Sequence, residues 1–86
     1  MIRIELYEMA RRRAGVTHVD VEATTLQEAL GALRAAVPSL VPDVLDEKGL
    51  APHWRIGRAD GPWLDDPFTP LSSGEVLVLV SALAGG

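Results

Sequence analysis

Two segments near the N-terminus alternate apolar and polar residues. In residues 2–7, IRIELY, every second side chain is aliphatic, and residues 17–23, THVDVEA, repeat the pattern. A period of two predicts a strand with one buried face. Residues 9–16 connect the two segments over a short distance and contain a glycine. The sequence therefore predicts an antiparallel hairpin with residues 9–16 as its loop.

A helical pattern follows the second predicted strand. Apolar residues recur at intervals of three and four from Leu26 to Val37, which is typical of a helix with one buried face. Thr25 stands three residues before Glu28. At this spacing a threonine hydroxyl caps the helix start, and the glutamate reaches back to the backbone amide of the cap. Pro38 disfavours helical geometry in the residue before it, so we expect the helix to end near Val37.

The second half of the chain predicts one helical turn and three strands. Residues 42–48 begin with proline and precede Gly49, which suits a single helical turn with a left-handed stop. Residues 53–57 predict a strand, and residues 63–64 predict a short one after an Asp-Gly-Pro turn. Residues 75–83, EVLVLVSAL, are almost all apolar. Such a run is typical of a central strand covered on both faces.

These elements predict one domain over residues 1–86 with an α+β fold. The helix between the second and third strands must cross one face of the sheet. Because polar residues alternate in the first two strands, we expect the other face to be mostly solvated. The prediction is a mixed sheet of four to five strands with one main helix packed on one face.

Composition narrows the classes of function. A chain of 86 residues, 48% hydrophobic and 23% charged, is typical of a globular domain with one core and little room for a deep pocket. The absence of cysteine excludes disulfides, thiolate metal sites and a thiol nucleophile on the chain itself, and it suits a cytoplasmic location. No apolar run approaches the roughly 20 residues that span a bilayer.

The charge of the chain bears on its partners. Eight Lys and Arg residues stand against twelve Asp and Glu residues, for a formal net charge of -4. A negative field repels phosphate backbones, so we expect no nucleic-acid partner and favour a basic protein partner. Arg11, Arg12 and Arg13 form the single basic cluster. In the predicted loop this cluster is either a solvated group of charges or a docking contact.

Enzyme motifs are missing from the sequence. His18 and His53 have no metal-ligand spacing and are expected at the surface. No serine lies in a G-x-S-x-G motif, and no glycines form a phosphate-binding loop. We therefore expect no metal site, no bound cofactor and no catalytic side chain.

The last predicted strand carries two sets of apolar side chains. Val76, Val78 and Val80 point to one face of the sheet, and Leu77 and Leu79 point to the other. One helix covers one face only, so one set is expected to be partly exposed and to mark a protein interface. Alternatively, the preceding loop and its two tryptophans fold over that face.

The chain ends with Ala84, Gly85 and Gly86. Three residues with little side-chain bulk predict a slender, flexible tail of about 10 Å that could thread a narrow channel in another protein. The carboxylate of Gly86 is ionised at neutral pH and is a poor electrophile. Adenylation would supply a leaving group, and a sulfur donor would then produce a thiocarboxylate. Sulfur could thus be carried without any thiol in the chain.

Two motifs resemble those of the β-grasp sulfur carriers, which are relatives of ubiquitin in fold and include the small subunit of molybdopterin synthase and the thiamine-pathway carrier. Residues 70–76, PLSSGEV, are similar to the P-L-x-x-G-[DE]-V motif before the last strand of that family. The ending 83–86, LAGG, is similar to its V-A-G-G or V-S-G-G terminus. Residues 9–11 and 14–15 also resemble the segment after the first strand in the molybdopterin members.

The resemblance implies a mechanism and partners. An E1-like adenylyltransferase and sulfurtransferase would use ATP and magnesium to activate Gly86, with Gly85 beside it. The tail would then insert into the large subunit of a sulfur-accepting synthase, so that Gly86 acts as a co-substrate. The expected partner interface consists of Val76, Leu77, Val78, Leu79, Val80, Leu83, Ala84 and Arg11.

The motifs indicate sulfur carriage more specifically than they indicate the pathway that receives the sulfur. Chain length favours molybdopterin synthesis, whereas Ser81-Ala82 stands where molybdopterin members often have two prolines, and residues 58–69 are longer than the usual turn. The alternatives are thiamine or cysteine synthesis, a ubiquitin-like modifier conjugated through Gly86, and an interaction module whose terminal glycines are incidental.

Overall fold

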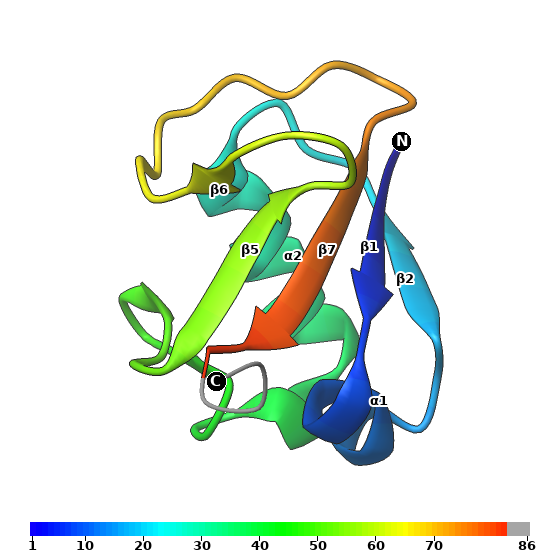
Figure 1. Cartoon of the computed structure of the whole chain (residues 1–86), viewed down its shortest axis with the longest axis vertical. Helices are drawn as coiled ribbons and strands as arrows, with labels where there is room; N and C mark the ends of the chain where they lie inside the picture. Colours follow the sequence, from blue (N-terminus) through cyan, green and yellow to red (C-terminus); the bar gives the residue numbers. More distant parts are fainter. Residues whose placement is uncertain (83–86) are drawn as a thin grey trace.

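Five strands form one mixed sheet in the computed structural model, which describes residues 1–82 (Figure 1). In spatial order the strands are β2 (His18–Val21), β1 (Ile2–Leu6), β7 (Val76–Ser81), β5 (Trp54–Arg58) and β6 (Trp63–Leu64). β1 is antiparallel to β2 and parallel to β7, and β5 is antiparallel to both β7 and β6. The predicted N-terminal hairpin and the central position of the last strand are therefore confirmed.

The remaining elements are three helices and a small hairpin: α1 (Glu8–Ala14), α2 (Leu26–Ala36), the 3-10 helix η1 (Pro38–Leu40), β3 (Leu45–Asp46) and β4 (Gly49–Leu50). α2 crosses one face of the sheet, which confirms the α+β prediction with one main helix (Figure 1). Within residues 1–82, no helix has the length and apolar character needed to cross a membrane.

Side chains from the sheet and α2 fill one core between the two layers. All of them are at least nine-tenths buried, and they include Ile2, Ile4, Leu6, Ile56, Leu77 and Leu79 from the sheet and Leu26, Ala29, Leu30 and Leu33 from α2. Among the elements of residues 1–82, no helix packs across the opposite face of the sheet (Figure 1). Burial of the apolar side chains in this one core is the main source of stability for a domain of this size.

The start of α2 follows the predicted capping pattern, and Thr24 adds two hydrogen bonds to it. The Thr25 hydroxyl accepts a hydrogen bond from the Glu28 backbone N–H at 3.2 Å, as predicted. The Glu28 carboxylate also accepts from the N–H and the hydroxyl of Thr24, each at 2.8 Å. Thr24 offers two donors to one carboxylate oxygen, and these hydrogen bonds lower the pKa of Glu28.

The predicted loop at residues 9–16 is wrong, because most of it is the helix α1. Ala10 is the one buried residue of this helix, so the segment carries no apolar periodicity. Gly15 ends the helix with φ +76 and donates its N–H to the carbonyl of Arg11 at 2.9 Å. A left-handed glycine is the usual C-terminal cap of a helix. The arginine cluster therefore lies on a helix and not in a loop.

The predicted helical turn at residues 42–48 is also wrong. Leu45 pairs with Leu50, and Asp46 pairs with Gly49, in the hairpin β3–β4. The Asp46 carboxylate accepts the backbone N–H of Lys48 at 2.8 Å, and Gly49 has φ +128. An aspartate followed by a glycine with positive φ stabilises a tight turn between two short strands.

The segment 70–76 fixes the start of β7 to β5 and to the first residue of the chain. Arg58 of β5 donates from Nε to Glu75 Oε1 at 2.5 Å and from Nη2 to the Pro70 carbonyl at 3.0 Å. The other oxygen of Glu75 accepts the N–H of Ser72 at 2.6 Å, and the Met1 carbonyl accepts the N–H of Gly74 at 2.9 Å. The motif thus joins β5, β7 and the chain start.

This junction predicts a pH dependence of stability. The Arg58 side chain, and then the Ser72 N–H, lower the pKa of Glu75 below its usual value of 4.5. The folded state favours the ionised form of this carboxylate. The contribution of Glu75 to the free energy of unfolding is therefore fully present above its unfolded pKa and is lost as pH falls through its lowered folded pKa. We expect Glu75→Gln to cost about 1 kcal/mol at neutral pH and to flatten the acid limb measured by urea unfolding. Glu47→Gln, at an exposed position, is the control and should change neither.

Candidate functional site

The end of β7 is tied to two neighbouring segments. The backbone N–H of Ala82 donates to the carbonyl of His53 at 2.7 Å, and the N–H of Tyr7 donates to the carbonyl of Leu79 at 3.3 Å. His53 itself adopts φ +74, in the left-handed region that non-glycine residues rarely occupy. The predicted site residues Leu83, Ala84, Gly85 and Gly86 follow directly and lie outside the described residues. Their predicted roles stay predictions.

Arg11 lies near this end of the sheet. Its Nε donates to the carbonyl of Leu6 at 3.0 Å, and its guanidinium lies 5.3 Å from the ring of Tyr7. The hydroxyl of Tyr7 donates to Glu5 at 2.9 Å, which raises the pKa of Tyr7. Arg11 is exposed, so a partner can still reach it beside the end of β7.

The rest of the arginine cluster divides between two roles. Arg13 forms an ion pair with Asp43 at 2.6 Å, and its backbone carbonyl accepts a hydrogen bond from the Ser39 hydroxyl at 2.6 Å. It therefore joins α1 to η1 and to the segment after η1. Arg12 is exposed and forms no ion pair within residues 1–82. The cluster is therefore partly structural.

The central strand shows which apolar set faces outward. Leu77 and Leu79 are fully buried in the core, so they are withdrawn from the predicted interface. Val76, Val78 and Val80 are half-buried on the face opposite α2. We refer to these three residues as the valine face.

Trp63 covers the space beside the valine face. It pairs with Gly57, which in turn pairs with Val78. A Cβ added to Gly57 would lie 2.9 Å from Cε3 of Trp63, so the glycine is needed for this close approach. Trp63 remains 49% exposed, and the Arg55 guanidinium lies 6.0 Å from its ring. The alternative prediction, in which the loop before β7 and its two tryptophans fold over this face, is therefore partly confirmed, because Trp63 lies beside it.

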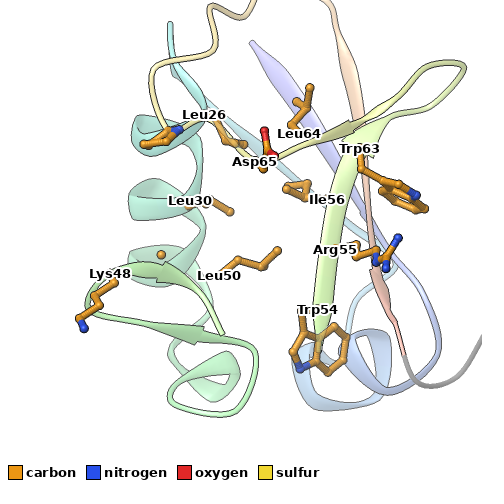
Figure 2. A pocket seen from close by; sticks show the side chains of 12 residues that line it. Leu26, Leu30, Lys48, Leu50, Trp54, Arg55, Ile56, Trp63, Leu64 and Asp65 are labelled. Carbon is orange, nitrogen blue, oxygen red and sulfur yellow. The ribbon is translucent and has the colours of Figure 1, made fainter. Parts of the chain in front are cut away.

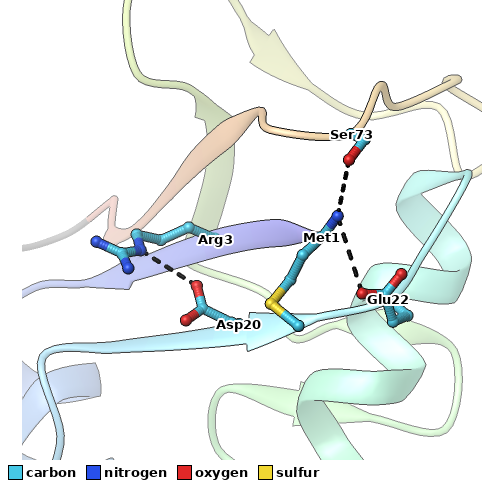
Figure 3. A network of polar contacts seen from close by, with 5 residues as sticks. All are labelled: Met1, Arg3, Asp20, Glu22 and Ser73. Atoms are coloured by element: carbon cyan, nitrogen blue, oxygen red, sulfur yellow. Dashed lines mark hydrogen bonds and ion pairs between the residues drawn. The ribbon is translucent and has the colours of Figure 1, made fainter.

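A polar rim borders the valine face on the β1 side. Arg3, which pairs with Val76 in register, donates to Asp20 of β2 at 3.1 Å. The N-terminal amine donates to the Ser73 hydroxyl at 2.9 Å and lies 3.9 Å from Glu22 (Figure 3). An apolar stripe inside a rim of charged groups is the usual anatomy of a protein interface.

The described residues contain no metal centre. Within residues 1–82, no three His, Cys, Asp or Glu side chains are placed to hold one ion. His18 and His53 are both exposed, as predicted. What the described geometry offers is a rigid strand end beside an apolar face, which is an arrangement for recognition by another protein.

Comparisons with solved structures identify the fold. Small archaeal modifier protein 1 from Haloferax volcanii is 28% identical, with a TM-score of 0.78, over 99% of this chain and 98% of that chain. The protein of that name from Methanosarcina acetivorans is 20% identical, with a TM-score of 0.81, over 99% of this chain and 95% of that chain. The BexX/CysO complex of Amycolatopsis orientalis contains a chain that is 16% identical, with a TM-score of 0.80, over the full length of both chains.

No protein-family model and no curated protein sequence matches the chain. The structural likeness nevertheless extends over nearly the whole of this chain and of its neighbours. It agrees with the five-stranded mixed sheet, the single main helix and the central last strand described above. The chain is therefore a β-grasp protein that resembles the ubiquitin-like modifiers and sulfur carriers of this fold.

Proposed function

We propose that the protein is a cytoplasmic sulfur carrier whose Gly86 is adenylated and then converted to a thiocarboxylate. An E1-like partner would transfer AMP from magnesium-bound ATP to the Gly86 carboxylate and release pyrophosphate. A synthase would then consume the sulfur in molybdopterin synthesis. The adenylated Gly86 carbonyl would be attacked by the sulfur donor, and AMP would leave. The chain itself would contribute the acyl group and the surface that the enzymes recognise.

One observation supports this proposal above the others. The strand that precedes the tail is the central strand of the sheet, and hydrogen bonds to Tyr7 and His53 hold its last residues. A tail that starts from a fixed point reaches an active site at a smaller entropic cost than one that starts from a mobile loop. The terminal sequence LAGG adds little side-chain bulk beyond Leu83.

Conjugation to a target protein is the second candidate function. The similar proteins from Haloferax volcanii and Methanosarcina acetivorans are called modifier proteins. Conjugation would use the same adenylate, but a lysine amine in place of the sulfur donor would attack the carbonyl of Gly86. An isopeptide bond survives denaturation, so denaturing purification of the tagged protein from its host separates the two functions. Persistent ladders indicate conjugation, and their absence supports carriage.

The direct test is an activation assay followed by intact-mass measurement. The purified chain is incubated with ATP, magnesium, a sulfur donor and candidate E1-like enzymes. Sulfur carriage predicts a mass gain equal to the replacement of one oxygen by sulfur. A mass that stays constant with every activating enzyme encoded by the same genome would contradict the proposal.

The valine face provides a second test of partner recognition. We expect Val78→Glu to weaken binding of the activating enzyme about 30-fold or more, because it places a charge at the centre of an apolar contact. Val78 is only half-buried, so the fold should persist. The matched control is Val16→Glu, since Val16 is apolar, 44% exposed and outside this face. Equal affinities for the two variants would place the interface elsewhere.

A further inference from the structure

A second apolar surface lies on the other side of the sheet. It is a groove of about 460 Å³ between α2, the hairpin β3–β4 and the strands β5 and β6 (Figure 2). Aliphatic side chains from four elements line it, namely Leu26, Leu30, Leu50, Ile56 and Leu64. Trp54 lies at the hairpin end (Figure 2). The volume falls within the range of about 300–1,000 Å³ that is usual for ligand sites.

The groove lies mainly on the α2 side of the sheet, and two of its lining residues, Arg55 and Trp63, stand on the side of the valine face. Side chains alternate along β5, so that Ile56 points to the α2 side and Gly57 points to the face that carries Trp63. Val76, Val78 and Val80 are not among the residues that line the groove. The inference below does not depend on the chemistry of Gly86.

The groove stays open because β6 is short. β6 pairs with only two residues of β5, Ile56 and Gly57. Next to it, Leu50, Trp54 and Leu64 remain half-buried and keep apolar surface in water. Covering that surface would be favourable.

Charge at one end of the groove favours a cationic group. Asp65 lines the end near Leu26 and Leu64 (Figure 2), and Asp66 follows it in the chain. Within residues 1–82, neither carboxylate forms an ion pair. Two cations, Lys48 and Arg55, also line the groove. Both charged groups point away from its centre (Figure 2), and the Arg55 guanidinium lies 6.0 Å from the ring of Trp63. The net charge of -4 adds to the attraction for a positive group.

The acidic end of the groove is held in place by α2. The N–H of Gln27 donates to the carbonyl of Pro67 at 2.8 Å, and the N–H of Leu26 donates to the carbonyl of Thr69 at 3.0 Å. Asp66 accepts the N–H of Phe68 at 2.9 Å. A preorganised rim loses little entropy when a partner binds.

We infer that this groove docks a segment of a partner protein in which an apolar side chain is flanked by lysine or arginine. The apolar side chain fills the space between Leu30, Leu50 and Leu64. The basic group lies beside Asp65. This gives the protein a recognition surface that is independent of its C-terminal tail.

The test uses three short synthetic peptides with the same Leu-Trp-Leu centre, flanked by lysine, glutamine or glutamate. Each is titrated into the full chain at low salt, and backbone amide shifts are followed by NMR. We expect the lysine peptide to shift residues of the groove and to bind about tenfold more tightly than the glutamate peptide, with the glutamine peptide between them.

Two surface variants test the electrostatic part. Asp65→Lys is expected to reverse the preference between the lysine and glutamate peptides, whereas Asp60→Lys, the same charge change at an exposed residue outside the groove, is expected to keep it. Deletion of Gly86 should leave all affinities unchanged. The inference is overturned by shifts confined to the valine face, by equal affinity for the three peptides, by the absence of binding, or by self-association through the groove.

Discussion

A chain that ends at Gly85 is expected to form no thiocarboxylate at all. Loss of one residue withdraws the terminal carboxylate by about 3.3–3.6 Å, and group transfer requires reacting atoms within about 3–3.5 Å of each other. The deletion should leave the fold intact, because the core consists of residues between Ile2 and Leu79. Intact mass after incubation with the activating enzyme measures the loss, and thermal unfolding checks the fold.

The control for this deletion keeps the chain length. Gly86→Ala retains a terminal carboxylate at the same distance from β7 but adds a methyl group. If the partner channel is narrow, this variant should react more slowly than the natural chain and still reach the thiolated mass. A full mass gain by the deletion variant would show that the acyl group of Gly86 is not the acceptor.

Leu79→Ala is expected to produce the largest loss of stability. Leu79 is fully buried in the central strand, and it pairs with Leu6 on one side and Ile56 on the other. Truncation of a buried leucine costs about 2–5 kcal/mol, which is a large part of the roughly 5–15 kcal/mol that stabilises a whole domain. Urea unfolding monitored by tryptophan fluorescence gives the measurement.

Val80→Ala is the matched control, because Val80 is the next residue on the same strand but points to the opposite face. It is half-buried, so its truncation should cost about 1 kcal/mol or less. If both variants lose the same stability, the assignment of Leu79 to the core and of Val80 to the outer face is wrong.

The sequence was informative where periodicity and capping are strong. Alternation in residues 2–7 and 17–23 predicts β1 and β2, and the Thr25 cap predicts the start of α2. α1 was missed because Ala10 is its only buried residue, although Gly15 one position after the helix was an available signal. The hairpin β3–β4 was missed because two-residue strands carry no period.

Part of the candidate site could also be predicted from the sequence, and part of it could not. The alternation of Val78 and Leu79 could be read from the sequence, but which of them is buried depends on the side that α2 covers. The contact of Trp63 with Gly57 depends on strand register. The groove depends on four elements that meet only in the folded chain. These features depend on contacts between segments that are distant in the sequence, and a local pattern of residues does not determine such contacts.

The parallel pairing of β1 with β7 has a consequence for biosynthesis. The first strand finds its central neighbour only when residues 76–79 have left the ribosome, so the sheet cannot be complete before that point of synthesis. Contacts between such distant segments also slow folding relative to local ones. A prematurely terminated polypeptide without β7 would lack the centre of its core and would be open to proteolysis.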